Sequence, residues 1–121
     1  MKNLMRLVAL LLPLVLLTLM IGPFGGAEAS TGVWDKAAHF IAFGLILWSF
    51  GVLFRRMPRL WAAILTIALG AAVEVIQGFV GRDASWGDLL ADALGVAAAL
   101  TLWVLWRGFR PRAALQTSNT R

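Results

Sequence analysis

The chain has 121 residues, of which 60% are hydrophobic and only 14% are charged, with a formal net charge of +5. An average soluble domain carries about 25% charged residues and at this size buries only about two-thirds of its chain surface, so a soluble fold could not hide this much apolar side chain. Disorder is excluded too, because disordered chains combine low hydrophobicity with high charge. There is no cysteine, which excludes a disulfide framework and a thiolate metal site.

Four apolar stretches are long enough to cross a bilayer, whose hydrocarbon core of about 30 Å needs roughly 17–25 helical residues. They lie at about residues 4–22, 37–54, 60–80 and 89–106. They lack the alternation of period two that barrel strands show, which favours helices. We therefore predict an all-α integral membrane four-helix bundle with short loops, formed by residues 1–108 as one domain, and a polar cytoplasmic tail at residues 109–121.

The first stretch also has features of a secretory signal peptide. Lys2 and Arg6 form a basic region at its start, and Ala27-Glu28-Ala29-Ser30 resembles a small-residue cleavage site. The apolar part of a signal peptide is usually only about 7–15 residues long, so we expect a retained span. Both interpretations place Ser30 outside the cytoplasm.

The basic residues predict the orientation of the spans, because cytoplasmic loops are enriched in Lys and Arg. A cytoplasmic N-terminus leaves only Lys36 and Arg82 on the outer side. We therefore predict that both termini are cytoplasmic.

No nucleic-acid partner is expected, since no binding motif accompanies the basic residues. The basic residues on the cytoplasmic side would be Lys2, Arg6, Arg55, Arg56, Arg59, Arg107, Arg110, Arg112 and Arg121.

The polar residues of the last three spans fall at one predicted depth. Spans two and four run inward and span three runs outward, and their polar residues lie at the outer ends. An ionisable residue costs about 2.5–3.5 kcal/mol at the centre of a membrane helix, so these side chains should face one another rather than lipid. We predict a polar pocket that opens to the outside. Its candidate ligand-binding residues are Lys36, His39, Glu74, Gln77, Arg82, Ser85, Asp88 and Asp92.

Structural roles explain some of these residues equally well. Ser85 is a typical N-cap, and Asp88 and Asp35 suit the first turn of a helix. Glu74 and Arg82 could form an interhelical pair. The Gly and Ala residues along the spans are typical of close helix packing and leave self-association into a homo-oligomer open.

Two ordered motifs run through these positions. Residues 35–43 read D-K-x-x-H-F-x-x-F, and residues 74–95 contain E-x-x-Q followed by R-x-x-S-x-x-D-x-x-x-D-x-x-G. Both motifs resemble those of the VanZ-like family of small multi-span bacterial membrane proteins. The family is named for a member linked to teicoplanin resistance. The family's motif has Asp or Asn at the position of Asp92. The resemblance covers about residues 33–106. It implies a cell-envelope role in the bacterial inner membrane and raises a link to glycopeptide (teicoplanin) resistance, but defines no molecular activity.

The first functional hypothesis is recognition of an anionic or lipid-linked envelope component. Lys36, Arg82 and His39 would hold its phosphate or carboxylate, with Arg82 best suited to bidentate contact. The expected partners are membrane lipid and a lipid-linked cell-wall precursor.

The second hypothesis is a small intramembrane enzyme, whose catalytic candidates are His39, Asp35 and Glu74. Asp35 would orient His39 as a general base, and Glu74 would act as the acid. His39, Glu74, Asp88 and Asp92 are acceptable ligands of a divalent metal, but no H-x-x-x-H pair is present, so we predict no metal and no cofactor. A third hypothesis is a structural helper subunit of a larger complex.

The first span provides a test of its own. We expect the purified protein to keep the residues before Ser30, because its first apolar stretch is longer than that of a signal peptide. N-terminal sequencing measures this directly. A chain that begins at Ser30 would show that the first span is absent from the mature fold.

Overall fold

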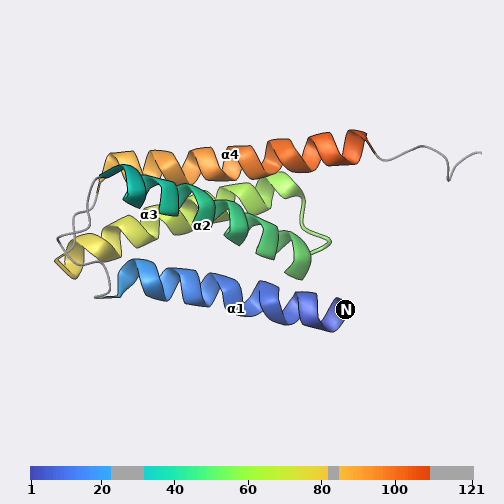
Figure 1. Cartoon of the computed structure of the whole chain (residues 1–121), viewed down its shortest axis with the longest axis horizontal. Coiled ribbons are helices and arrows are strands. Elements are labelled where there is room, and N and C mark those ends of the chain that lie inside the picture. The colour runs from blue at the N-terminus through green and yellow to red at the C-terminus, as the bar shows by residue number, and fades with distance from the viewer. Residues whose placement is uncertain (23–31, 82–84, 110–121) are drawn as a thin grey trace, which may run out of the picture.

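The structure is a computed structural model that describes residues 1–22, 32–81 and 85–109 (Figure 1). These residues form four helices, α1 (Lys2–Ile21), α2 (Gly32–Leu53), α3 (Arg59–Phe79) and α4 (Trp86–Gly108), and contain no strand. Each helix is long and apolar enough to cross a membrane. The predicted all-α architecture with four spans is confirmed. Of the predicted polar tail, residues 110–121 lie outside the described residues.

Two helices begin earlier than the apolar stretches within them. α2 begins at Gly32 and α4 at Trp86, and each has an aspartate in its first turn, Asp35 or Asp88. Ser85 is the N-cap of α4, as predicted, because its Oγ accepts a hydrogen bond of 3.0 Å from the Asp88 N–H. Capping residues decide where a helix begins, whereas hydropathy marks only its lipid-compatible part.

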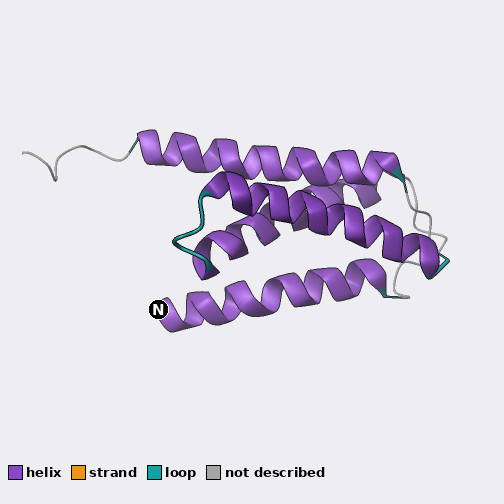
Figure 2. Ribbon diagram, turned by 180° about the vertical axis from the view of Figure 1, so that it is seen from behind, coloured by secondary structure: helices purple, strands orange, loops and turns teal. Residues whose placement is uncertain are grey.

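Successive helices run antiparallel (Figures 1 and 2). One end of the bundle, here called the site end, carries the last turns of α1 and α3 and the first turns of α2 and α4. The opposite end carries the N-terminus, the connection between α2 and α3 and the last turn of α4. The predicted meeting of spans two, three and four at one end is therefore present. The orientation of this bundle in a membrane stays a prediction.

α2 is the central helix, since the two most extensive helix contacts, with α4 and with α1, are both its own and it also packs against α3. Its inner face has residues at spacings of three and four, as expected for one stripe of a helix. The outward faces of all four helices carry large exposed apolar side chains, as lipid-facing surfaces do. The buried apolar core consists of Ala42, Phe43, Ile46 and Leu47 on α2, Ala62, Ala63 and Val73 on α3, and Val96 on α4.

The backbones of α2 and α4 approach each other closely at Gly95. A Cβ atom at Gly95 would overlap the carbonyl oxygen of Phe40 on α2. One turn further along α2, a Cβ at Gly44 would lie 3.4 Å from the Gly95 carbonyl oxygen. Small residues allow such approaches between membrane helices. The contact fixes the first half of α4 against the first half of α2, where the polar residues lie.

We expect Gly95→Ala to destabilise the protein, because the added methyl group must separate the two backbones. Overpacking of this kind costs about 1–3 kcal/mol. The matched control is Gly108→Ala on the same helix, where an added Cβ meets nothing within 4 Å. That control should be neutral or stabilising by up to about 1 kcal/mol, the helix-propensity gain of Ala over Gly. Unfolding in detergent micelles measures both, and equal effects would contradict the close approach.

Candidate functional site

Three buried ionisable side chains from three different helices meet at the site end: His39 from α2, Glu74 from α3 and Asp92 from α4. We call these three residues the polar triad. His39 Nδ1 donates a hydrogen bond of 2.7 Å to Oδ1 of Asp92, and Oε1 of Glu74 lies 3.9 Å from the same Nδ1. Their exposed fractions are 2%, 8% and 0% respectively. The triad is therefore a buried contact between helices.

Local sequence places these side chains on inward faces. His39 precedes the buried Phe43 by one helical turn, and their rings are stacked with centroids 6.3 Å apart. Asp92 precedes the buried Val96 by the same interval. Gly70 on α3 faces Asp92, because a Cβ there would lie 2.8 Å from Asp92 Oδ2. Only glycine leaves room for this carboxylate against α3.

The triad has more acceptors than donors among the described residues. Oε1 of Glu74 and Oδ2 of Asp92 are buried without a hydrogen-bond partner there. Buried polar atoms in folded proteins are nearly always bonded, so such exceptions call for an explanation. The structure shows two carboxylates against a single imidazole, an arrangement suited to binding a proton, a cation or a donor group.

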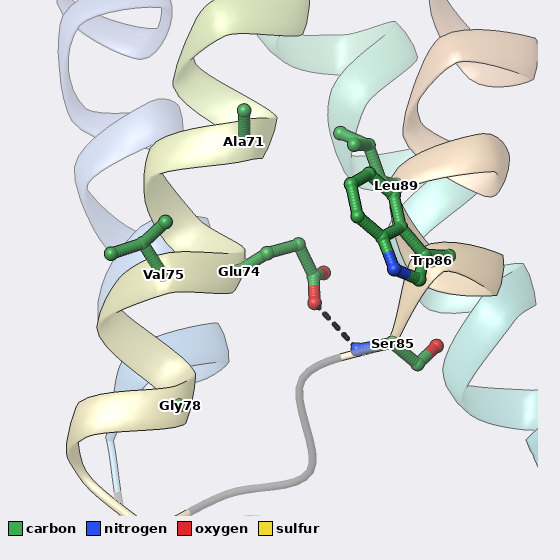
Figure 3. Close-up of a pocket in the computed structure, with 7 residues that line it drawn as sticks. All are labelled: Ala71, Glu74, Val75, Gly78, Ser85, Trp86 and Leu89. Atoms are coloured by element: carbon green, nitrogen blue, oxygen red, sulfur yellow. Dashed lines mark hydrogen bonds between the residues drawn. The ribbon is translucent and has the colours of Figure 1, made fainter.

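The second oxygen of Glu74 points to a different place. Oε2 accepts a hydrogen bond of 3.0 Å from the Ser85 N–H, at the start of α4 (Figure 3). It lies in a cleft between α3 and α4 with a volume of about 380 Å³. Most of the cleft wall is apolar, and among the described residues Glu74 contributes its only ionisable side chain. The cleft is lined by Ala71, Glu74, Val75, Gly78, Ser85, Trp86 and Leu89.

Lys36 of α2 lies against the first turn of α4. Its Nζ is 3.6 Å from Oδ1 of Asp88, and its side chain is about half exposed whereas that of Asp88 is buried. A Cβ at Gly87 would lie 2.7 Å from Lys36 Cε, so the lysine crosses the first turn of α4. Lys36 therefore places a positive charge beside Gly87 and Asp88 in the first turn of α4.

Gln77 connects α1 to the rest of the site end. Its Nε2 donates a hydrogen bond of 3.0 Å to the carbonyl oxygen of Met20, near the end of α1. Gln77 is buried, and its Oε1 has no hydrogen-bond partner among the described residues. The bond makes α1 part of the packed bundle and satisfies a carbonyl in the last turn of that helix.

The described candidates all lie at the site end, but they do not form one cavity. Lys36, Asp88 and Ser85 lie around the start of α4, the triad is buried, and Gln77 faces α1. Arg82, the residue expected to bind an anion, lies outside the described residues. The apolar cleft walls, such as Val75 and Leu89, were not singled out by the sequence analysis, because nothing distinguishes them from other apolar residues of a span.

The Nδ1 hydrogen bond of His39 has a different partner from the one expected. The enzyme hypothesis has Asp35 orienting His39, because the two are four residues apart on one helix. The hydrogen bond of Nδ1 runs instead to Asp92 of α4. Asp35 is exposed, although it does lie with His39 and Asp88 in a group whose ligand atoms are within 4.8 Å of one another. Helical spacing brings two residues to one face, but a neighbouring helix can supply a closer partner.

The His39–Asp92 bond predicts different effects for two substitutions. Asp92→Asn keeps a carbonyl acceptor for the His39 N–H and should cost less than about 1 kcal/mol of unfolding free energy. Asp92→Ala leaves that buried donor without an acceptor, and should cost about 1–3 kcal/mol. Denaturant unfolding in detergent compares the two. Equal losses would mean that the hydrogen bond does not stabilise the bundle.

Comparison with known proteins agrees with this architecture. The model of the VanZ/LLP1 family matches residues 2–107. No curated protein and no solved structure matches the chain. The matched range includes α1 and extends beyond the motif-bearing residues 33–106, so it covers all four helices almost completely. The chain is therefore a multi-pass membrane protein of the VanZ/LLP1 family.

Proposed function

We propose that this protein recognises an anionic lipid-linked or cell-wall component of the bacterial envelope, with the site end of the bundle facing outward from the inner membrane. The observation that carries the proposal is the cleft between α3 and α4, in which apolar walls end at a carboxylate and a helix N-terminus. An amphiphile with an acyl tail and a polar head has the matching distribution of chemistry.

The walls of the cleft suit a hydrocarbon chain. Val75 and Trp86 are largely exposed, with 60% and 86% of their surface accessible, and Leu89 and Ala71 extend the apolar surface between the helices. Such a cleft opens to the side of the bundle. A lipid tail can therefore enter from the bilayer without crossing water.

The polar end of the cleft suits a head group. Backbone N–H groups at the start of α4 favour negative charge, as helix N-termini do. Lys36 adds a positive charge beside them, and Arg82 precedes Ser85 by three residues in the sequence. A phosphate or carboxylate would contact these cations. Glu74 would accept a hydrogen bond from a hydroxyl or amide of the same head group.

A second candidate function is the intramembrane enzyme, which the His39–Asp92 bond favours. A carboxylate that fixes an imidazole is a common element of general-base sites, and Glu74 supplies a second carboxylate 3.9 Å from the same nitrogen. Glu74 also lines the cleft, so a ligand held there would lie next to the triad. Conversion of a bound lipid, rather than its binding alone, would distinguish this function.

A purely structural role accounts for part of the site. It explains the Ser85 cap and the Lys36–Asp88 pair, both of which stabilise the start of α4. It does not explain why Glu74 Oε1 is buried without a hydrogen-bond partner in the described part of the chain. A role in teicoplanin resistance would follow from the family's name-giving member and has no support of its own in the geometry.

Filling the cleft tests the proposal. We expect Ala71→Phe to reduce the lipid that co-purifies with the protein at least about fivefold, which corresponds to about 1 kcal/mol of binding energy. Ala68→Phe is the matched control, since Ala68 is also an exposed alanine of α3 but lies outside the cleft. Native mass spectrometry of the detergent-extracted protein measures bound lipid for both variants and the wild type.

The head-group contacts have a separate readout in the same measurement. Lys36→Ala and Arg82→Ala should deplete phosphorylated lipids among the bound species and leave neutral lipids in place. Identical lipid content in the wild type and in all these variants would refute the proposed recognition. Loss in Ala68→Phe to the same extent would show that the cleft is not the binding site.

A further inference from the structure

The polar triad has the arrangement of a cation site built by three helices. One ligand atom from each of His39, Glu74 and Asp92 lies within 4.8 Å of the other two. Metal–ligand distances of about 2.0–2.2 Å for imidazole and carboxylate put two ligands of one ion at most about 4.4 Å apart. The Nδ1–Oε1 separation of 3.9 Å already falls within that range. A small rotation of the Glu74 and Asp92 side chains would bring all three atoms onto one ion.

A second and independent observation is the unpartnered oxygen of Glu74. Oε1 is buried, faces His39 Nδ1, and has no hydrogen-bond partner in the described part of the chain. The residue is only 8% exposed. Neither Glu74 nor Asp92 forms a salt bridge to a lysine or arginine within the described ranges 1–22, 32–81 and 85–109. The excess of carboxylate oxygens in this buried place is therefore left for a positive ligand.

The neighbouring acidic group is a poorer cation site. Asp35, His39 and Asp88 also bring ligand atoms within 4.8 Å of one another. However, Oδ1 of Asp88 lies 3.6 Å from the ammonium group of Lys36, and Asp35 is exposed. A positive charge beside a carboxylate opposes the binding of a cation there. The two groups share His39.

From these observations we propose that His39 Nδ1, Glu74 Oε1 and one carboxylate oxygen of Asp92 bind a divalent transition-metal ion. The donor set decides the class of metal. Imidazole suits zinc and iron, carboxylates suit manganese, and Mg²⁺ and Ca²⁺ prefer oxygen ligands alone, so Zn²⁺ or Mn²⁺ fits best. The ion takes the place of the proton on Nδ1, so a neutral His39 carries its ring proton on Nε2, and a protonated His39 must first lose one proton. Binding therefore weakens as the pH falls.

The position of the site gives the ion access to a ligand from outside the protein. Three protein ligands leave at least one coordination position open, as in catalytic zinc sites. Glu74 belongs both to the triad and to the cleft wall. A head group in the cleft would therefore lie next to the ion. The metal proposal does not depend on lipid recognition, because the ligand atoms all come from this chain.

Metal content measures the proposal directly. The full chain, purified in detergent through a tag without histidine, is treated with a chelator, incubated with Zn²⁺ or Mn²⁺, passed through a gel-filtration column and submitted to elemental analysis. We expect about one ion per chain for the wild type, as one three-ligand site holds one ion. Glu74→Gln and Asp92→Asn should each weaken binding at least about tenfold, since even outer-shell changes commonly have effects of that size.

Asp88→Asn is the matched control, because it removes a carboxylate from the neighbouring group only. It should keep its ion. Added Zn²⁺ or Mn²⁺ should also raise the unfolding temperature of the wild type and of Asp88→Asn, but not that of Glu74→Gln. Glu74→Gln retains an oxygen for the Ser85 N–H, so its fold should survive.

Three results would overturn the proposal. The first is a wild-type protein that retains neither ion. The second is loss of the ion in Asp88→Asn with retention in Glu74→Gln, which would place it in the neighbouring group. The third is unchanged metal content in every variant, which would indicate adventitious binding elsewhere on the chain. Should a variant fail to fold, the wild-type stoichiometry and its pH dependence still decide the question.

Discussion

The site end of this protein depends on one constraint: ionisable side chains buried in an apolar bundle must find their partners within the bundle. Glu74, Asp92 and His39 lie on three different helices, and each would cost about 2.5–3.5 kcal/mol at the centre of a span if it faced lipid alone. The hydrogen bond between His39 and Asp92 meets part of this requirement and joins α2 to α4. The rest of the site is arranged around that bond.

The bond is short because two glycines remove the side chains that would keep the helices apart. Gly95 lets α4 approach the Phe40 carbonyl of α2, and Gly70 leaves space on α3 for the Asp92 carboxylate. Both glycines cost helix propensity, about 1 kcal/mol each relative to alanine. Both glycines lie next to the triad. The close packing of small residues in the core is therefore what makes room for the polar site.

Most of the fold could be predicted from the sequence, but the pairing within the site could not. The four apolar stretches predicted the helices, and the alternating direction of the spans predicted that Lys36, Glu74 and Asp88 would gather at one end. Helical spacing also grouped Asp35 with His39, whereas the hydrogen bond goes to Asp92. The rotation of each helix about its axis decides such pairs, and it depends on close contacts such as that of Gly95. The proposed metal ligands could not be predicted from the sequence for the same reason, because three residues from three helices form no local motif.

Glu74 joins parts of the site that would otherwise be separate. Its Oε1 faces His39, and its Oε2 accepts a hydrogen bond from the Ser85 N–H. The Ser85 hydroxyl in turn accepts a hydrogen bond from the Asp88 N–H, and the Asp88 carboxylate pairs with Lys36. Polar contacts therefore run from the buried triad to the partly exposed Lys36 at the start of α4. If the cleft and the triad bind ligands as proposed, a ligand that draws Glu74 toward His39 would pull on the N-cap of α4, and a ligand that draws it into the cleft would release the triad. Because one carboxylate serves both places, the two proposed sites would be coupled through Glu74, in either direction and by the same free energy.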